Sequence, residues 1–342
     1  MKTITSKICL TIVLTFHIQS MFAQDTHYTQ FDAEPLSLNP AFTGMFDGNI
    51  RTSILARTQW DNEGAGYAIY GGSADMPVFT ANDGDYLGAG GEYIKSEHND
   101  LSGGGTPYNL ATVASLAYHK FFGSTDTTQK HKTRELSFGI QLAYVENNID
   151  LLLVNRSFIG GTGQYASPHV QDYMVNTGIS FSQSLSSRFN YVIGASGYNL
   201  NQPGNANDRE QNRRTGLDTR YTFTFGANWN ITNRLTFRPV IIYQTSDAEN
   251  NLIAGNEFHY VASKYPLKNH KTPTALFAGI YYNTGDIITY AAGIDLNAFR
   301  IGLGHIQSTI DRQTGGYQIE IRYILPSHKP FASKRTIPCN RF

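Results

Sequence analysis

Apolar and polar positions alternate along much of this 342-residue chain. In residues 136–144 every even position is apolar and every odd position is small or polar. Residues 221–229 and 317–323 repeat the pattern, with the apolar side chains at the odd positions. A period of two indicates β-strands, because successive side chains on a strand point to opposite faces. The alternation therefore predicts an all-β protein.

Fourteen segments of the chain carry a strand pattern. They are residues 50–58, 66–74, 86–95, 109–122, 135–146, 173–182, 188–199, 219–230, 234–245, 251–262, 274–283, 287–297, 298–307 and 316–325. An even number of strands is typical of a closed bacterial membrane barrel whose two chain ends share the periplasmic side. Pro239 is unusual within its segment, because proline cannot donate to a strand ladder. It predicts either a bulge or a later start of that strand.

A soluble β-sandwich also alternates, so the period alone leaves two architectures open. The segments approach the roughly 9–11 residues that a tilted membrane-spanning strand needs. Aromatic residues gather at strand ends, such as Tyr221 with Trp229 and Tyr317 with Tyr323, as the interfacial girdles of a barrel require. The sequence offers no helices to cover the apolar face. We therefore predict a transmembrane antiparallel β-barrel with a short periplasmic N-terminal segment.

The first residues have the layout of a secretory signal peptide. Lys2 and Lys7 are basic, residues 8–16 are mainly apolar, and residues 21–23 end the segment at Ala23. Positive charge, an apolar run and then a processing site direct a chain to export. The apolar run is too short for a membrane-spanning helix, which needs about 20 residues. Residues 1–23 are therefore predicted to be a signal peptide, and the mature protein is expected in the cell outer membrane.

The remainder of the chain divides into three predicted parts. Residues 24–49 form a periplasmic N-terminal segment, residues 50–325 the barrel, and residues 326–342 a periplasmic C-terminal tail. In this orientation the two longest connections, residues 147–172 and 200–218, face the outside. Long outer loops and short periplasmic turns are the asymmetry expected of an outer-membrane barrel.

Charge and cysteine content narrow the class of protein. Without Lys2 and Lys7, 25 of the 27 basic residues remain beside 27 acidic residues. This balance argues against a nucleic-acid-binding protein, which needs a concentrated basic face. Only Cys339 follows the predicted signal peptide, so no intrachain disulfide is expected, although an oxidising compartment permits one.

Candidate catalytic groups are few. Ser115 and His119 share one face of a strand, but the sequence indicates neither an orienting acid nor an oxyanion donor for them. HExxH and CxxC motifs are absent from the mature sequence. The Asp-rich stretches 82–85 and 205–208 lack the spacing of an EF-hand loop and suit ordinary turns. We therefore predict no enzymatic activity, no cofactor and no metal site.

The inner face of the barrel should be polar and partly small. The charged or titratable residues expected in the lumen are Arg300, His305, Glu320 and Arg322. The small inward residues include Gly139, Ala143, Thr222 and Thr224. A barrel of about 14 strands is wide enough to leave space beside such residues. Either part of the protein or water must therefore occupy the lumen.

The N-terminal region carries a distinct set of residues. They are Gln30, Phe31, Pro35, Asn39, Pro40, Ala41, Gly44, Arg51, Gln59 and Trp60. In this set, and in residues 198–203 and 337–342, the chain resembles the PorP/SprF family of type IX secretion membrane proteins. The resemblance covers essentially the whole mature chain. Asn340 departs from it, because the family's terminus commonly has proline there.

Residues 35–44 predict tight turns, because proline fixes φ and glycine reaches positive φ easily. Such a segment suits a position docked under the barrel mouth, before the first strand. One interpretation is a plug or cap. The resemblance implies a second one, in which the ten N-terminal residues form a surface that binds periplasmic machinery.

The resemblance implies a non-enzymatic outer-membrane component of the type IX secretion and gliding machinery. Such a component supports export or surface display of particular cargo, often large adhesins. Its implied partners are periplasmic secretion-ring lipoproteins, peptidoglycan-binding components, the secreted cargo and outer-membrane lipid. The residues by themselves keep one alternative open, a channel or transporter for small or hydrophobic solutes.

Overall fold

The computed structural model describes most of the predicted barrel. The described residues are 34–59, 66–80, 84–98, 108–122, 133–148, 169–202, 218–247, 250–262, 274–310 and 315–326. The predicted signal peptide and the tail beyond residue 326 lie outside these ranges, as do Gln30, Phe31 and Trp60. Cys339 and the Asp-rich stretch 205–208 also lie outside them.

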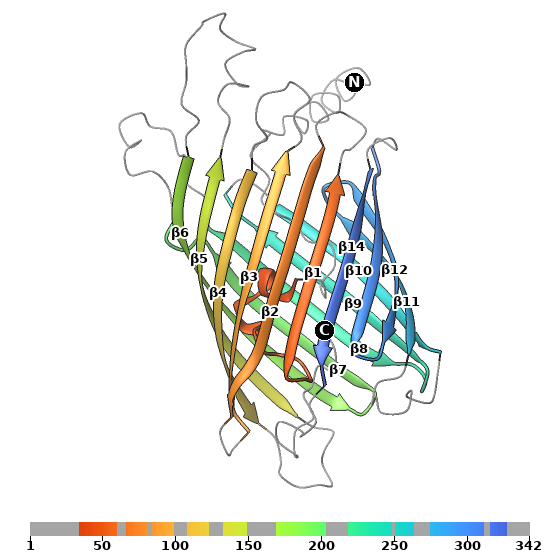
Figure 1. The fold of residues 1–342 in the computed structure, drawn as a ribbon. Coiled ribbons are helices and arrows are strands. Elements are labelled where there is room, and N and C mark those ends of the chain that lie inside the picture. Colours follow the sequence, from red (N-terminus) through yellow and green to blue (C-terminus); the bar gives the residue numbers. More distant parts are fainter. Residues whose placement is uncertain are drawn as a thin grey trace, which may run out of the picture.

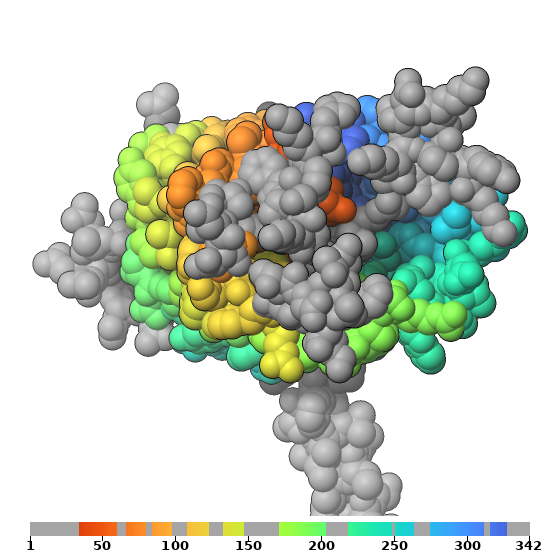
Figure 2. Space-filling view, turned by 90° about the horizontal axis from the view of Figure 1, so that it is seen from below, coloured from red at the N-terminus to blue at the C-terminus, as the bar shows by residue number. Residues whose placement is uncertain are grey.

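Fourteen antiparallel strands in the described residues form a closed barrel (Figure 1). The strands are β1 (Ile50–Gln59), β2 (Tyr67–Thr80), β3 (Tyr86–His98), β4 (Tyr108–Phe122), β5 (Arg134–Asn148), β6 (His169–Ser186), β7 (Phe189–Tyr198), β8 (Arg220–Asn230), β9 (Leu235–Thr245), β10 (Asn250–Val261), β11 (Ala275–Asn283), β12 (Ile287–Leu296), β13 (Phe299–Ser308) and β14 (Gly315–Leu325). Each strand pairs with its sequence neighbours, and β14 closes the ring against β1. Figure 2 shows the first and last strands side by side in the wall. The predicted fold is confirmed.

Two strands are much longer than the alternation predicts. β2 continues to Thr80 instead of ending at residue 74, and β6 covers residues 169–186 instead of 173–182. The added residues 76–80 of β2 pair with β3 alone, across a register shift that begins at Pro77. Residues 169–176 of β6 pair with β5 alone. Backbone pairing with one neighbouring strand therefore extends β2 and β6 beyond the residues whose side chains alternate.

Pro239 lies inside β9 without the predicted bulge or late start, so that prediction is wrong. The strand begins at Leu235, and Pro239 faces Asn256 in an unbroken register with β10. On the other side, the pairing of β9 with β8 is interrupted at Pro239 and resumes at Val240 in the same register. The missing N–H of proline is accommodated by this one-sided interruption.

The two faces of the wall differ as the alternation predicts. Apolar side chains cover the outside, among them Ile140, Leu303 and Tyr317, which are 61%, 58% and 64% exposed. Neighbouring residues such as Gln141 and Gln318 are buried inside. Lipid requires this apolar outer face, and closure of the barrel leaves no unpaired strand edge. No helix among the described residues is long and apolar enough to cross a membrane.

A short segment before β1 lies inside the barrel. It contains α2 (Pro35–Leu38) and the 3₁₀ turn η1 (Pro40–Phe42), both within the ring of strands in Figure 1. Every residue from 34 to 46 is buried, and we call residues 34–46 the plug. The plug lies within the lumen rather than beneath the barrel mouth, which corrects the expected docking position. The lumen can take it because many inward residues of the wall are small.

Candidate functional site in the barrel lumen

The plug folds as two tight turns on either side of Asn39. Pro35 and Pro40 each begin a short helix, a position where the N–H that proline lacks is not needed. The Asn39 side chain accepts a hydrogen bond from the Ala41 N–H at 2.9 Å. Gly44 has a φ of +77°, which glycine adopts without steric cost. The turn chemistry predicted from the sequence is confirmed.

Three glycines of the wall receive the centre of the plug. Gly139 on β5 lies against the backbone of Pro40. Gly178 on β6 and Gly194 on β7 lie against the side chain of Asn39. A Cβ atom at any of the three positions would overlap the plug. The space expected beside Gly139 is therefore filled by the protein's own N-terminal segment.

Polar groups on β5, β6 and β7 bind the plug closely. Asn39 Nδ2 donates to the carbonyl oxygens of Ile179 and Ala195, at 3.1 and 3.3 Å. The further donors are Gln141 and Tyr198 to the Leu36 carbonyl oxygen, at 3.0 and 3.1 Å, and Ser196 to the Leu38 carbonyl oxygen, at 2.8 Å. These bonds satisfy backbone carbonyl groups that would otherwise be costly to bury.

His119 on β4 binds the plug through Thr43. Its Nε2 donates to the Thr43 carbonyl oxygen at 2.7 Å, and its Nδ1 lies 2.8 Å from Oε1 of Glu135. Tyr86 stacks on the imidazole with a centroid separation of 4.1 Å, and its hydroxyl donates to the same Glu135 oxygen. All of these side chains are buried, so the contact excludes solvent.

The Ser115–His119 pair takes part in this contact. Ser115 Oγ bonds to Oγ1 of Thr43, while His119 binds the Thr43 carbonyl oxygen. The structure supplies an orienting acid, Glu135, that the sequence did not indicate. Nucleophilic catalysis needs the serine hydroxyl to hydrogen-bond to the histidine. Here Thr43 binds both residues instead. The arrangement holds the plug.

Arg51 and Asp75 hold the end of the plug that leads into β1. Arg51 donates to both carboxylate oxygens of Asp75, at 2.9 and 2.7 Å, and to the Phe42 carbonyl oxygen at 3.1 Å. Asp75 accepts a further hydrogen bond from the Gly44 N–H at 2.6 Å. The guanidinium also lies 4.9 Å from the ring centre of Phe46. This two-point geometry is the strong form of an arginine–carboxylate pair.

Two carboxyl groups meet where the plug begins. Glu34 faces Glu92 of β3 and Ser73 of β2, and its side chain is fully buried. Ser37 Oγ donates to Glu92 at 2.6 Å. Within the described residues, neither oxygen of Glu34 has a hydrogen-bond donor of good geometry. A buried carboxylate in this state is costly unless another charge or a proton compensates it.

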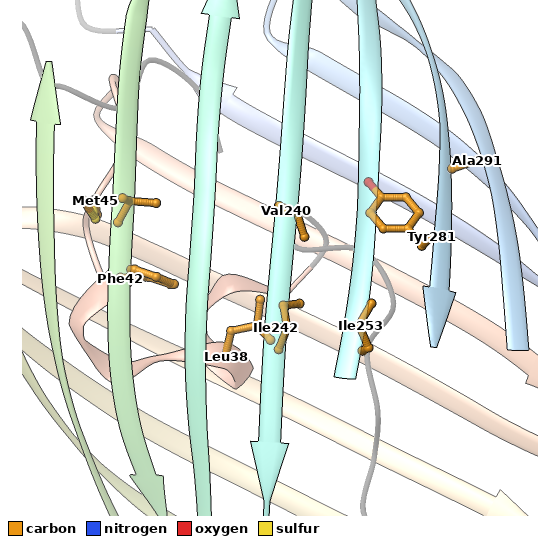
Figure 3. Close-up of a cluster of buried hydrophobic side chains, with 9 residues drawn as sticks. Leu38, Phe42, Met45, Val240, Ile242, Ile253, Tyr281 and Ala291 are labelled. Carbon is orange, nitrogen blue, oxygen red and sulfur yellow. The ribbon is translucent and has the colours of Figure 1, made fainter. Parts of the chain in front are cut away.

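The opposite side of the plug is apolar (Figure 3). Leu38, Phe42 and Met45 point toward strands β7 and β9–β12. The wall residues of this cluster are Val192, Val240, Ile242, Ile253, Tyr281 and Ala291. The plug therefore has a hydrogen-bonded side and an apolar side, each matched to the wall that it meets.

Charged residues of β10–β14 occupy another part of the lumen. Arg300 donates to Glu257 at 2.6 Å and to Glu320 at 3.1 Å. His259 lies 2.7 Å from Glu257 and 3.4 Å from Asp295. Arg300, Glu320 and Arg322 are all buried inside the barrel, as predicted.

His305 was expected in the lumen, and this expectation is wrong. It lies on the outer face of β13, where its ring packs 5.3 Å from that of Tyr317. Positions 300 and 305 are an odd number of residues apart, so an unbroken strand turns them to opposite faces.

Seven of the ten N-terminal residues that carry the family resemblance, here called the family-type residues, fall within the described residues. Pro35, Asn39, Pro40, Ala41, Gly44, Arg51 and Gln59 are all buried inside the barrel. Their wall partners Asp75, Glu92 and Glu135 carry no motif in the sequence. These three are acidic residues at inward positions of strands, but period two gives no information about which plug residue each one meets. No group of three or more His, Cys, Asp or Glu side chains in the described residues could hold a metal.

A closed barrel with an apolar outer face and a lumen filled by its own N-terminal segment defines an outer-membrane β-barrel protein. The model of the family described as "Type IX secretion system membrane protein PorP/SprF" matches residues 20–323. The chain therefore belongs to the PorP/SprF family and is an outer-membrane component of type IX secretion.

Several solved barrels are similar at low sequence identity. The toluene transporter TbuX of Ralstonia pickettii is 10% identical, with 86% of this chain and 94% of that chain covered and a TM-score of 0.45. The P. putida toluene transporter TodX is 12% identical, with coverages of 85% and 93% and a TM-score of 0.44. CdiB from Escherichia coli is 8% identical, with coverages of 80% and 63% and a TM-score of 0.48. A search of curated proteins gives no match.

Proposed function

We propose that this protein supports the export or surface display of particular secreted proteins, without catalysing a reaction. In this proposal it docks partners in the periplasm, namely secretion-ring lipoproteins and peptidoglycan-binding components, and it contributes to gliding where the cell glides. The observation that carries the proposal is the family match over residues 20–323.

The plugged lumen supports an interaction protein over a channel. The plug is hydrogen-bonded to β4–β7 and packed against β7 and β9–β12. Charged pairs around Arg300 occupy a further part of the interior. A solute would have to displace several buried contacts at once, so this interior is poorly suited to passive conduction.

The family-type residues fit an indirect role in partner binding. In the structure Asn39, Gly44 and Arg51 contact the barrel's own wall and are buried. We propose that they fix the shape of the barrel end that partners bind, while Gln30, Phe31 and the rest of residues 24–33 make the direct contacts.

Deletion of the gene tests the proposal. We expect one or a few surface proteins to disappear from the cell surface, while uptake of small solutes stays unchanged. Surface proteomics of the deletion strain and of the complemented strain measures the first effect, and solute uptake assays measure the second. Normal display of every secreted protein in the deletion strain would contradict the proposal.

A crosslinked pull-down of the tagged protein from outer membranes identifies its partners. Recovery of ring components or of one large secreted protein supports docking. A barrel recovered without partners, together with reduced solute uptake in the deletion strain, would support the channel alternative instead.

A further inference from the structure

A cavity lies at the end of the barrel where β1 begins and β14 ends. Its volume is about 80 Å³, and its wall includes the turn from β12 to β13 and the last residues of β14. Asp47, in the short link between the plug and β1, forms another part of the wall. The hydrogen bonds that hold the plug, described above, do not use the residues of this cavity. It is therefore a separate feature of the same barrel end.

The cavity presents acidic groups to solvent and keeps its basic groups covered. Asp47 is exposed, and the side chain of Asp295 is 15% exposed. Arg300 and Arg322 also line the cavity, but they are only 2% and 6% exposed. The charges that an entering group meets first are therefore the two carboxylates.

The charges behind the cavity do not cancel this acidic character. Arg300 donates to two buried glutamates of the lumen, at 2.6 and 3.1 Å, so its charge is already matched. The carboxyl groups at or behind the cavity are those of Asp47, Glu257, Asp295 and Glu320. Arg300 and Arg322 supply two positive charges, and His259 supplies at most one more. These described groups therefore have a negative sum when the carboxyl groups are ionised.

The chain leaves the described part of the barrel at this cavity. Pro326, the last residue of the described ranges, is part of the cavity wall. Residues 327–342 of the predicted C-terminal tail contain four Lys or Arg residues and no Asp or Glu. The first of these cations is Lys329, and a stretch of three residues reaches about 10 Å. A positive charge that belongs to the chain itself is thus within reach of the cavity.

The residues around Lys329 also match the rim of the cavity. Pro330 follows Lys329, and a proline favours an extended conformation of the residue before it. In an extended chain, side chains two positions apart point to the same side, so Phe331 would accompany Lys329. The rim offers Phe299, which lines the cavity and is 50% exposed. One short stretch of the tail therefore carries both a charge and an aromatic ring for this site.

We propose that residues 327–331 dock on this cavity, with the Lys329 ammonium group beside Asp47 and Asp295 and with Phe331 on Phe299. Asp47 belongs to the link between the plug and β1, so the docked tail fixes that link at the end of the barrel. The docking does not depend on the proposed function. A partner that binds at this end has to displace the tail or bind over it.

Disulfide formation within one chain tests the proposal. In a Cys339→Ser background, Ala298→Cys places a thiol in the cavity wall, and Ala332→Cys places a second thiol directly after the proposed contact. The rate of disulfide formation in detergent, followed on non-reducing gels, measures how often the tail lies at the cavity. Salt screens exposed charges, so we expect this rate to fall about threefold between about 0.05 M and about 0.5 M salt.

Charge variants identify the contact. Asp47→Lys should slow disulfide formation about tenfold, and Lys329→Gln should slow it about fivefold, because each removes the attraction between exposed charges. Asp47→Lys combined with Lys329→Asp should restore the parent rate to within about twofold, since the exchanged charges attract again. Asp286→Asn, at the other end of the barrel, is the matched control, and asparagine suits its positive φ of 59°. Heat-modifiable migration on gels verifies that each variant has formed a barrel.

Three results would overturn the proposal. The first is a rate of disulfide formation that neither Asp47→Lys nor Lys329→Gln changes. The second is a loss in Asp47→Lys that the exchanged pair does not restore, because another group would then occupy the cavity. The third is a rate that does not depend on salt.

Discussion

Single glycines of the wall decide whether the plug fits. At Gly139, Gly178 and Gly194 the plug backbone or the Asn39 side chain takes the place that a Cβ atom would need. A side chain at these points meets backbone or a buried amide, and neither can move without moving the whole plug. Overpacking a filled interior typically costs about 1–3 kcal/mol.

Gly139→Val should therefore displace the plug while leaving the strands paired. We expect faster thiol labelling of Leu38→Cys in this variant than in its parent at the same pH, by at least about tenfold for about 1.4 kcal/mol of overpacking. Gly72→Ala is the matched control, because a Cβ atom there has only the Ser53 carbonyl oxygen near it, at 3.8 Å. Equal labelling of the Gly139→Val variant and its parent would show that the plug is not seated on Gly139.

Individual residues also show where inference from the sequence ends. Ser115 and His119 were recognised as a same-face pair, which the structure confirms. Their common partner Thr43 is 72 and 76 residues away in sequence, and Glu135 is on the next strand. Periodicity gives the face of a side chain but no long-range partner. For His305 the sequence was sufficient. It lies five residues after Arg300 on one strand, so the period of two places it on the outer face.

Among the elements, the strands were predictable and the plug's position was not. The boundaries of β9 to β14 agree with the alternation to within one residue, because each has one face in lipid and one in the lumen. The plug has neither period, and its two helical turns span only four and three residues. Its turn residues were recognisable, but the wall that covers them includes eight strands that follow it in sequence, β4–β7 and β9–β12.

The turn before β3 is anchored by one carboxylate. Asp85 accepts hydrogen bonds from the Tyr118 hydroxyl at 2.6 Å, Lys120 Nζ at 2.7 Å and the Phe121 N–H at 3.0 Å. Burial of the carboxyl group acts to raise its pKa, but these three donors outweigh burial and lower the pKa of Asp85 below its ordinary value. The turn is thereby fixed to β4.

This anchor should be lost in acid. A lowered pKa in the folded state stabilises the protein above the unfolded value of about 4, and the contribution disappears as pH falls through the folded value. Asp85→Asn should lower the free energy of unfolding by about 1 kcal/mol at neutral pH, since Lys120 is partly exposed. Urea unfolding in detergent at about pH 7 and about pH 3 measures the difference. An effect of Asp85→Asn that is equally large at both pH values would contradict this role.

At the scale of the whole molecule, the barrel and the plug are one structural unit. Small inward residues, polar groups on β4–β7 and an apolar patch on β7 and β9–β12 together match the three kinds of surface that residues 34–46 present. An interior built in this way is complementary to one occupant. This member of the PorP/SprF family therefore has a barrel whose lumen is occupied by residues 34–46 of its own chain.

Removal of the plug should open the barrel. We expect the intact protein to give no stable conductance in planar lipid bilayers, and a variant with residues 34–46 replaced by a Gly/Ser linker of equal length to conduct ions. The linker keeps the chain length but loses the contacts of Asn39, Thr43 and Phe42. Identical currents from the two proteins would show that the plug does not close the pore.

The plug is joined to the wall by very little chain. Residues 47–49 alone separate it from β1, and the Asn49 N–H is fixed to the Leu325 carbonyl oxygen at 2.8 Å, beside the seam where β14 meets β1. Three residues span about 10 Å at full extension, so a released plug stays close to the lumen at an effective concentration of millimolar order or above. Reclosure is consequently fast and unimolecular, and a partner that captures the released segment must compete with this local concentration.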